Sequence, residues 1–416
     1  MKIFKRSIIA LALLCSLTLI LLACIVSESS KKDTYVVMLS LDAYRWDYPD
    51  LTSTPNLHAI ASNGVRANAL IPCFPSKTFP NHYSMATGLH PDHHGIVCNN
   101  FYDSTLGYYS IGDRKAVGNS NFYGGEPIWV TAEKQGIISA SYFWVGTETQ
   151  IKGHQPTYWK KYNQKTPFED RIDTVIHWLS LPIGKRPRFI TWYSHEPDWT
   201  SHDYGPTGAK TLAMASKLDS LIGVFMIKLS KLPHADKINF IVVSDHGMAD
   251  ISSERYINLS DYVSKDLFDI ITGGNPVYSL KPKADKKAEA LAKLKAIPNL
   301  KVWEKHELPA RYVYGKNSRI NDIVIEAELG YSVGWSFKSE PYSGGTHGYD
   351  NQYPEMHGIF FAQGPAFAKG IKHEAFSNTN LYGIIAHILG LKPEPTDGNL
   401  QDVKGLFSKE FVLKDE

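Results

Sequence analysis

The stretch Ile71–Asn100, IPCFPSKTFPNHYSMATGLHPDHHGIVCNN, places a hydroxyl residue at the junction between a loop and a helical pattern. Thr78 stands two residues before Pro80, and proline suits the first turn of a helix. The start of a helix offers free backbone N–H groups and the positive end of the helix dipole, so it attracts anions. Thr78 is therefore a candidate nucleophile toward a phosphoryl group, although capping a helix is the ordinary role of a threonine in this position.

Three apolar, β-branched runs elsewhere in the chain each lead into an aspartate. Such runs are typical of strands buried on both faces, and amphipathic helical patterns lie between them. Strands that alternate with helices predict an α/β fold with a mostly parallel central sheet flanked by helices, whose ligands collect at the carboxyl ends of the strands. We therefore expect three carboxylates to meet at one edge, where Thr34–Leu41 leads into Asp42, Arg188–Tyr193 leads to Asp198 and Ile238–Ser244 leads into Asp245.

Histidines accompany these carboxylates. His202 follows Asp198 by four positions, which puts both on one face if the turn is helical, and His246 directly follows Asp245. His347 stands between glycines after a long intervening segment. Each pair alone would more often be an exposed ion pair or a loop histidine, but all of them share the strand-end position. Counting ligands favours two Zn²⁺ ions, one held by Asp198, His202 and His347 and the other by Asp42, Asp245 and His246, with Thr78 completing the second set.

This ligand set also explains how a threonine could attack phosphorus. A free hydroxyl is a weak nucleophile at neutral pH, and coordination to a dication makes its alkoxide accessible. Two dications and three aspartates leave a single positive charge, which complements the single negative charge of a phosphate diester.

The start of the chain has the features of a lipoprotein signal peptide, predicted over residues 1–23. A basic segment at residues 2–6 precedes an apolar run at 8–23 that is short for a membrane span. The run closes with LLAC, so Cys24 is the expected lipidation site, and residues 24–33 would form a polar tether. An uncleaved signal anchor is the alternative. Both interpretations place the rest of the chain outside the cytoplasm, in the periplasm or at the cell surface, held to a membrane.

The remaining chain is long enough for one large domain with an insertion. We predict a catalytic core at residues 34–274 and 334–416, interrupted by a small α+β insertion at 275–333. Within the insertion we expect strands near 276–281, 300–303, 310–314 and 322–328 and a helix at 284–296, and after it a core strand at 359–362 and a helix at 378–389. The formal net charge of +2 gives no support for a nucleic-acid-binding surface, and no specific protein partner is evident.

Two cysteines, Cys73 and Cys98, remain after the signal region. In an oxidising compartment they could form a disulfide that ties the Thr78 loop to the segment after its helix, and two buried thiols are the alternative.

Six segments together resemble the nucleotide pyrophosphatase/phosphodiesterase family of the alkaline phosphatase superfamily, in a compact bacterial form. They appear in family order between Asp42 and Asn351, and the segment around Thr78 alone matches over some twenty positions. The segments are LDAYRWDY, PSKTFPNHYSMATGLHPDHHGI, NNFYD, EPDWTSHDYGP, SDHGM and GGTHGYDN. The resemblance implies an alkaline-phosphatase-like fold, a phosphothreonine intermediate on Thr78 and the two-zinc assignment given above.

The resemblance also implies the substrate contacts. An asparagine donates to a nonbridging phosphate oxygen, and Asn99 matches it, although Asn100 is an alternative. Phe79 and Tyr193 match the aromatic slot for a nucleotide base. Further candidates are Tyr162, for which core packing is equally plausible, and Lys77, which could instead be a solvated lysine.

These expectations combine into one functional hypothesis. The chain is predicted to be a zinc-dependent phosphodiesterase outside the cytoplasm that cleaves nucleotide diesters or pyrophosphates and releases nucleoside 5′-monophosphates. A phosphodiesterase for choline phospholipids or other glycerophosphodiesters would share every metal ligand. A phosphomonoesterase is disfavoured because no arginine adjoins Thr78, and a non-catalytic surface lipoprotein because all ligand candidates are present.

Overall fold

The computed structural model describes residues 33–335 and 343–413. The predicted signal peptide, Cys24 and nearly all of the tether therefore lie outside the described residues. Within the described ranges, every helix is too short or too polar to cross a membrane.

The central sheet has eight strands, and its middle strand is β1 (Tyr35–Leu41). The neighbours of β1 are β8 (Phe189–Ser194) and β9 (Ile238–Val243), and both run parallel to it. The prediction of a mostly parallel sheet is confirmed on this side, which β6 (Ser139–Tyr142) and β7 (Tyr158–Lys160) extend in parallel. Beyond β9 the sheet is mixed: β18 (Phe360–Gln363) is antiparallel to both β9 and β2 (Val65–Ala67), and β19 (Ile371–His373) closes the edge.

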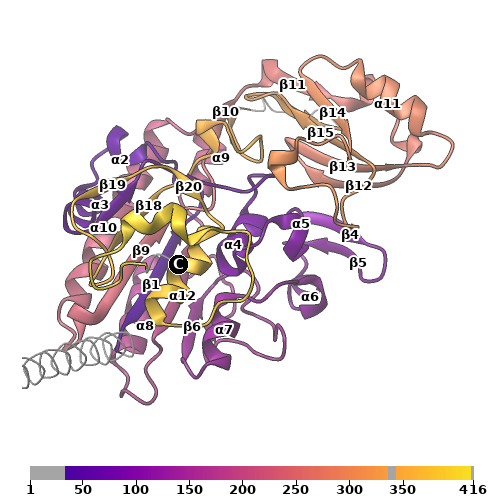
Figure 1. Ribbon diagram of the computed structural model, residues 1–416. Helices are drawn as coiled ribbons and strands as arrows, with labels where there is room; N and C mark the ends of the chain where they lie inside the picture. The colour runs from indigo at the N-terminus through magenta and orange to yellow at the C-terminus, as the bar shows by residue number, and fades with distance from the viewer. Residues whose placement is uncertain (1–32, 336–342, 414–416) are drawn as a thin grey trace, which may run out of the picture.

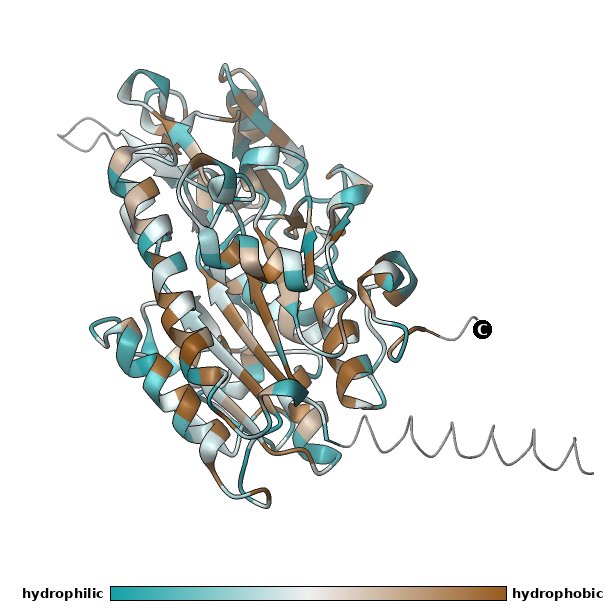
Figure 2. Ribbon diagram, turned by 90° about the vertical axis from the view of Figure 1, so that its left-hand side faces the viewer, coloured by the Kyte–Doolittle hydropathy of each residue, from teal (hydrophilic) through white to brown (hydrophobic). Residues whose placement is uncertain are grey.

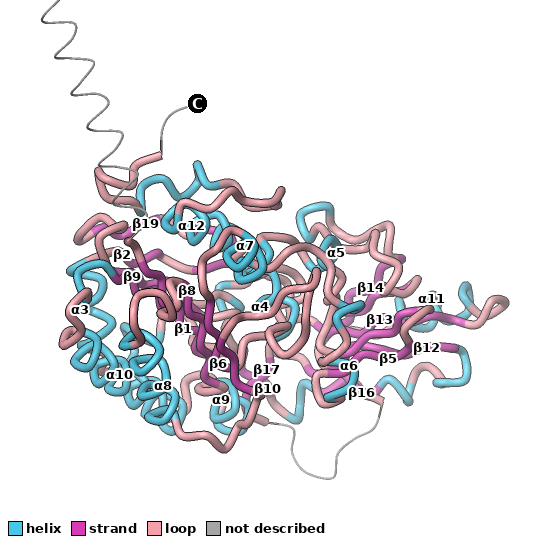
Figure 3. The backbone as a smooth tube through the Cα atoms, turned by 90° about the horizontal axis from the view of Figure 1, so that it is seen from below, coloured by secondary structure: helices cyan, strands magenta, loops and turns pink. Residues whose placement is uncertain are grey.

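Helices cover both faces of the sheet (Figures 1 and 3). Side chains of β1 alternate between the two layers, since Val36 and Met38 belong to one core cluster and Val37 and Leu39 to the other. Hydrophobic residues are concentrated in the central strands (Figure 2). One layer contains α3 (Pro55–Asn63), α8 (Phe168–Ser180) and α10 (Ala209–Leu229), and the other contains α4 (Thr78–Thr87), α7 (Ile128–Lys134) and α12 (Asn380–Leu389).

Shorter elements surround this sandwich and connect it to the insertion. They are α2 (Tyr48–Leu51), α5 (Pro91–His94), α6 (Arg114–Val117), α9 (Asp198–Tyr204) and the strand pairs β3 (Leu70–Ile71) with β20 (Phe376–Ser377), β4 (Asn100–Asp103) with β5 (Gly107–Ser110), β10 (Ala249–Ile251) with β17 (Gly344–Thr346), and β11 (Tyr256–Asn258) with β16 (Ser332–Gly334).

The insertion is a separate four-stranded sheet with one helix, at the upper right of Figure 1. Its sheet begins earlier than the predicted boundary at residue 275, because β12 (Phe268–Gly274) already pairs with β13. The remaining elements fall close to the predicted ranges: β13 (Val277–Pro282), α11 (Lys287–Lys295), β14 (Leu300–Glu304) and β15 (Ile323–Ala327).

The strand expected at residues 310–314 is wrong. Ala310–Tyr312 forms a 3-10 helix after Pro309, and Val313 has a left-handed φ of 46°. The aromatic residues of this segment instead attach the insertion to the core, because Tyr312 stacks on Phe74 at 3.9 Å between ring centroids. The segment thus packs against the core and does not extend the sheet of the insertion.

The expected disulfide is also wrong, since Cys73 and Cys98 are both free buried thiols. Cys73 donates from Sγ to Asn378 Oδ1 at 3.3 Å, and burial raises the pKa of both thiols. Their setting therefore matches the alternative of two buried cysteines.

Candidate active site

Thr78 is the first residue of α4, where the chain leaves the loop over the carboxyl edge of the sheet. Its Oγ1 lies 3.3 Å from His246 Nε2, so the predicted nucleophile meets a predicted metal ligand from a distant part of the sequence. The helix starts two residues before Pro80, and the backbone N–H of Phe79 already donates to Asn99 Oδ1 at 3.0 Å. One of the N–H groups expected to face an anion is thus used to fix an asparagine beside the nucleophile.

Asp42, Asp245 and His246 converge at the ends of β1 and β9. His246 Nε2 lies 3.1 Å from Asp245 Oδ2 and 3.4 Å from Asp42 Oδ1, and the ligand atoms of all three lie within 4.8 Å of one another. Ala43 adopts a left-handed φ of 52° directly after Asp42, and its N–H donates to Asp245 Oδ1 at 3.2 Å. The two strand ends are therefore joined by a specific backbone contact.

Asp198, His202 and His347 form the adjoining group. Asp198 and His202 lie on α9, as the four-residue spacing predicted, with Asp198 Oδ1 at 3.4 Å from His202 Nε2. The same oxygen lies 3.7 Å from His347 Nε2, which enters from the loop after β17. The rings of His347 and His246 stack at 3.7 Å, so the two groups are contiguous. His246 also falls within 4.8 Å of the ligand atoms of Asp198 and His347.

Each of the three histidines has its Nδ1 atom 2.8 Å from a backbone carbonyl oxygen. The acceptors are Gly345 O for His202, Gly247 O for His246 and Ser76 O for His347. A histidine that donates from Nδ1 keeps the lone pair on Nε2, and this is the tautomer that binds metal through Nε2. Sequence reasoning missed these carbonyls because a backbone acceptor has no residue signature.

Gly345 has a steric reason to be glycine. An added Cβ would approach the Ser201 carbonyl oxygen to 2.6 Å and the Met248 side chain to 2.7 Å. The close approach of this strand to α9 is what brings the Gly345 carbonyl to His202.

The charge distribution fits bound dications. Asp42 Oδ1, Asp198 Oδ1 and Asp245 Oδ2 are buried without accepting a hydrogen bond. In the ranges 33–335 and 343–413, the ion-pair partners of these aspartates are all histidines. Three carboxylates gathered out of water need compensating positive charge. Oxygen and imidazole ligands with open positions suit Zn²⁺ or a similar divalent ion.

Burial and the close spacing of these charged groups also shift their pKa values. Burial and the neighbouring Asp245 and Asp198 raise the pKa of Asp42 well above its usual range. Burial opposes the ionisation of Asp245 as well, but His246 and His82 lower its pKa. Burial and the adjacent His246 lower the pKa of His347, which keeps its imidazole neutral and able to act as a ligand.

A pocket of about 310 Å³ opens beside Thr78 and Asp42. The predicted slot residues Phe79, Tyr162 and Tyr193 all line it. Tyr193 has a second role, because its hydroxyl donates to Asp42 Oδ2 at 2.5 Å. The sequence analysis did not predict the other residues that line the pocket. The one available signal was that Trp199 directly follows the predicted ligand Asp198. These further lining residues are Ile111, Arg114, Val117, Phe143, Trp144, Val145, Gly146, Glu148, Gln164, His195 and Trp199.

Lys77 lies on the other side of the metal ligands. It is buried and donates from Nζ to the carbonyl oxygens of Asn275 and His347, each at 2.6 Å. Burial lowers the pKa of Lys77 to about 8. With Asn99, Asn100 and the tip of the β12–β13 hairpin it lines a second cavity of about 320 Å³. Lys77 is therefore not a solvated lysine, and it connects the nucleophile loop to the insertion.

His82, which is not one of the predicted ligands, also contacts the site. It is 1% exposed, its Nε2 lies 2.8 Å from Ser40 Oγ, and its Nδ1 lies 3.3 Å from Asp245 Oδ2. The available signal was its position four residues after Thr78, whose carbonyl oxygen is 2.9 Å from the same Nδ1.

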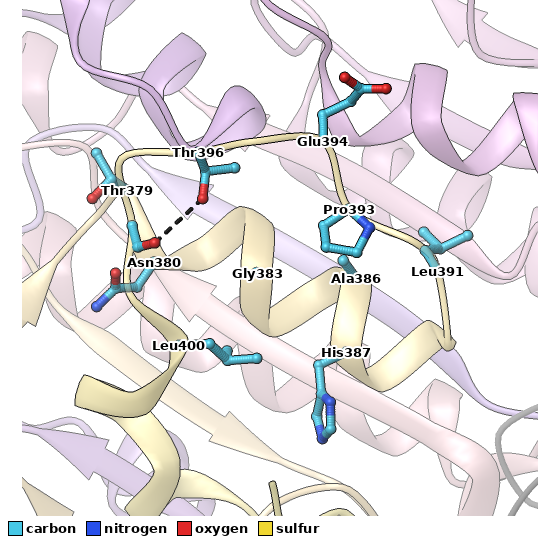
Figure 4. A pocket seen from close by; sticks show the side chains of 11 residues that line it. Thr379, Asn380, Gly383, Ala386, His387, Leu391, Pro393, Glu394, Thr396 and Leu400 are labelled. Carbon is cyan, nitrogen blue, oxygen red and sulfur yellow. Dashed lines mark hydrogen bonds between the residues drawn. The ribbon is translucent and has the colours of Figure 1, made fainter. Parts of the chain in front are cut away.

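A further cavity of about 300 Å³ lies between α12 and the segment 391–400 (Figure 4). Thr396 donates across it from Oγ1 to Gly398 O at 3.3 Å. Its lining contains none of the predicted ligands or slot residues, so this cavity is separate from the candidate active site.

Comparison with known proteins identifies the family of the chain. The family model described as type I phosphodiesterase/nucleotide pyrophosphatase matches residues 36–350. Human ectonucleotide pyrophosphatase/phosphodiesterase family member 5 is 35% identical over 375 residues, covering 90% of this chain and 78% of that protein. Venom phosphodiesterase 2 of Crotalus adamanteus is 34% identical over 386 residues, covering 90% of this chain and 48% of that protein. The chain spans about half the length of the venom enzymes that it matches.

A solved structure shows the same fold. Murine ectonucleotide pyrophosphatase/phosphodiesterase 5, as an inactive threonine-to-alanine variant in complex with AMP, matches with a TM-score of 0.86 and 36% identity. The match covers 90% of this chain and all of that one. The expected α/β architecture, with helices around a mixed central sheet, is therefore confirmed.

Proposed function

Because the chain belongs to the type I phosphodiesterase/nucleotide pyrophosphatase family, we propose that it hydrolyses nucleotide phosphodiester or pyrophosphate bonds and releases nucleoside 5′-monophosphates. The observation that carries this proposal is the convergence of Thr78 with two metal-ligand groups at the mouth of an aromatic pocket. The pocket has room for one nucleoside, and the murine relative binds AMP.

Two Zn²⁺ ions are the proposed cofactors, with Asp198, His202 and His347 holding one and Asp42, Asp245 and His246 holding the other beside Thr78. When bound, they would favour the alkoxide form of the Thr78 hydroxyl and neutralise charge on the phosphoryl oxygens.

The proposed reaction proceeds by two displacements. Thr78 Oγ1 forms a bond to phosphorus while the bond to the leaving oxygen breaks, which gives a phosphothreonine and an alcohol or phosphate. A water molecule then attacks the same phosphorus, and the nucleoside 5′-monophosphate departs as the threonine hydroxyl is restored. Asn99, held through its Oδ1 by the Phe79 N–H, is positioned to donate from Nδ2 to a nonbridging oxygen.

Three esters test the substrate class. The zinc-loaded protein should turn over p-nitrophenyl thymidine 5′-monophosphate faster than p-nitrophenyl phosphorylcholine and p-nitrophenyl phosphate. A preference for the phosphorylcholine ester would overturn the nucleotide assignment in favour of lipid head groups. Equal inertness toward all three would favour a surface protein without turnover.

The nucleophile is tested by a matched pair of threonines on the same helix. Thr78→Ala should keep folding and zinc content and lose at least about 1,000-fold in kcat, because covalent catalysis is removed. Thr87→Ala, at the end of α4, removes a hydroxyl that donates to Tyr83 O at 2.8 Å and accepts the Leu89 N–H at 3.3 Å, and it should retain turnover. Full turnover in the Thr78 variant would refute the assignment.

We further propose that the protein acts outside the cytoplasm, attached to a membrane through a lipid on Cys24. The LLAC box supports this placement, as does the "ecto" designation of the relatives. Radiolabelled palmitate should be incorporated when the full chain is produced in a bacterium, and Cys24→Ser should abolish the label. Labelling that persists in that variant would place the lipid elsewhere.

A further inference from the structure

Arg171 is a buried cation behind the wall of the aromatic pocket, and the proposed mechanism does not use it. It lies on α8 and is 1% exposed. Its guanidinium donates from Nη1 to Tyr193 O at 2.7 Å, and from Nε and Nη2 to Thr166 O at 3.2 and 2.7 Å. Arginine is almost never fully buried unless it is paired, and here all of these partners are carbonyl dipoles.

These contacts join the three segments that carry the aromatic wall. The Arg171 guanidinium carbon lies 5.1 Å from the ring centroid of Phe143. The ring of Tyr162 lies 5.2 Å from that of Phe143 and 6.2 Å from that of Tyr193. Phe143, Tyr162 and Tyr193 all line the pocket. A single side chain therefore contacts the end of β8, the residue after β6 and the segment that follows β7.

The three segments do not depend equally on Arg171. Tyr193 is held in register opposite Ser40 in the sheet, and β8 is paired on both sides. Residues 161–167 form no strand or helix, and the Thr166 carbonyl oxygen accepts two of the three hydrogen bonds from the guanidinium. Loss of Arg171 should therefore loosen the segment with Tyr162 far more than it disturbs the sheet.

We propose that Arg171 is a positioning residue, which orders residues 161–167 and so places the Tyr162 ring against the nucleobase of the substrate. The inference rests on the proposed nucleotide specificity and adds a determinant of it. The planar guanidinium donates to the two carbonyls from separate nitrogens held in a fixed fork, a geometry that the single nitrogen of a lysine ammonium does not reproduce.

The test compares a diester that contains a base with one that does not. In Arg171→Lys, kcat/KM for p-nitrophenyl thymidine 5′-monophosphate should fall about tenfold, mainly through a higher KM, because base stacking is weakened. The loss for methyl p-nitrophenyl phosphate should be much smaller. In the Tyr162→Ala background, Arg171→Lys should cause little further loss, because both changes act on one contact.

Arg186 provides the matched control. It is half-buried, donates from Nε to Leu181 O at 2.8 Å and lies near the ring of Tyr35, at the other end of the sheet. Arg186→Lys should leave the ratio of the two activities unchanged. In Arg171→Lys, backbone amide hydrogen exchange should become faster at residues 161–167 and stay unchanged at 189–194. This measurement reports on the order of the segment even if the variant has little activity.

The outcomes separate the two proposals. Equal losses on both diesters, or additive losses with Tyr162→Ala, would make Arg171 merely structural and overturn the positioning role alone. Failure of the unmodified protein to prefer the thymidine ester would overturn the nucleotide assignment, and the positioning role with it.

Discussion

The carboxyl edge of the central sheet and the insertion both bury carboxylates, but they do so in different ways. In the insertion, Glu326 is fully buried but accepts the Asp350 N–H at 2.8 Å and lies 3.5 Å from Lys301 Nζ. At the sheet edge, Asp42 and Asp245 each retain a buried oxygen that accepts no hydrogen bond, and both are paired with histidines. The difference indicates that the insertion satisfies its buried charge from its own chain, whereas the edge is built to be completed by a metal.

Removal of metal should give the largest difference between the two regions. Dialysis against a chelator should reduce diester hydrolysis at least about 1,000-fold, and Zn²⁺ should restore it, because the dications supply the main electrostatic stabilisation. The melting temperature should fall as well, since the aspartates at the edge then repel one another. Undiminished turnover in protein shown by metal analysis to be free of divalent ions would contradict the comparison.

The next largest effect should come from neutralising a single buried aspartate, because only an aspartate at the sheet edge should affect zinc content. Asp42→Asn should lower zinc content and reduce kcat/KM roughly 100-fold or more, because it removes a ligand beside the nucleophile. Asp92→Asn is the matched control, since Asp92 is buried on α5 and accepts the N–H groups of Gly315, Lys316 and Asn317. The control should lose stability and keep its zinc. Equal zinc loss in both variants would mean that Asp42 is no more a metal ligand than Asp92 is.

Substitutions in the aromatic pocket should reduce activity less than substitutions of the metal-ligand candidates. Phe79→Ala should raise KM for nucleotide esters roughly 5- to 100-fold and leave zinc content unchanged, because base stacking contributes about 1–3 kcal/mol. Phe101→Ala is a useful comparison, because this ring packs on Tyr109 at 4.7 Å in the core and does not line the pocket. A rise in KM of the same size in both variants would indicate general loosening of the core.

Glu326 should affect stability alone and leave turnover unchanged. Burial raises the pKa of Glu326 to about 7, against an ordinary value of 4.5, even though Lys301 opposes the shift. The folded state then binds more protons between those values, so this group lowers the free energy of unfolding as pH rises from about 4.5 to 7. Glu326→Gln removes that term, and its stability relative to the unmodified protein should rise by on the order of 3 kcal/mol across this window.

Thermal melts at pH 5 and pH 8 would measure this change, with zinc content and turnover as controls. If the stability of Glu326→Gln relative to the unmodified protein instead decreases from pH 5 to pH 8, Lys301 outweighs the effect of burial on Glu326.

The sequence predicted which residues meet at the carboxyl edge of the sheet better than it predicted their surroundings. The apolar runs of β1, β8 and β9 led to Asp42, Asp198 and Asp245 because a parallel sheet needs continuous hydrophobic strands and displays the residues after them at one edge. The antiparallel direction of β18 could not be deduced, since a buried strand has the same composition in either direction. Arg171 also had no signal, because its partners are backbone carbonyls.

The insertion was predicted in outline, and its errors have physical reasons. The segment expected as a strand at 310–314 is instead a 3-10 helix, and Tyr312 and Tyr314 from it contact Phe74 of the core. The boundary at residue 275 was placed too late, because β12 belongs to the insertion through its pairing with β13, and such a pairing has no local signal in the sequence.

His347 enters the chain after the whole insertion, although its partners Asp198 and His202 come before it. During synthesis, a nascent chain that has emerged only as far as β15 would carry an incomplete set of ligands. The full set of candidate ligands would thus be present only after residue 347 has emerged, and a product truncated before that residue would lack one of them.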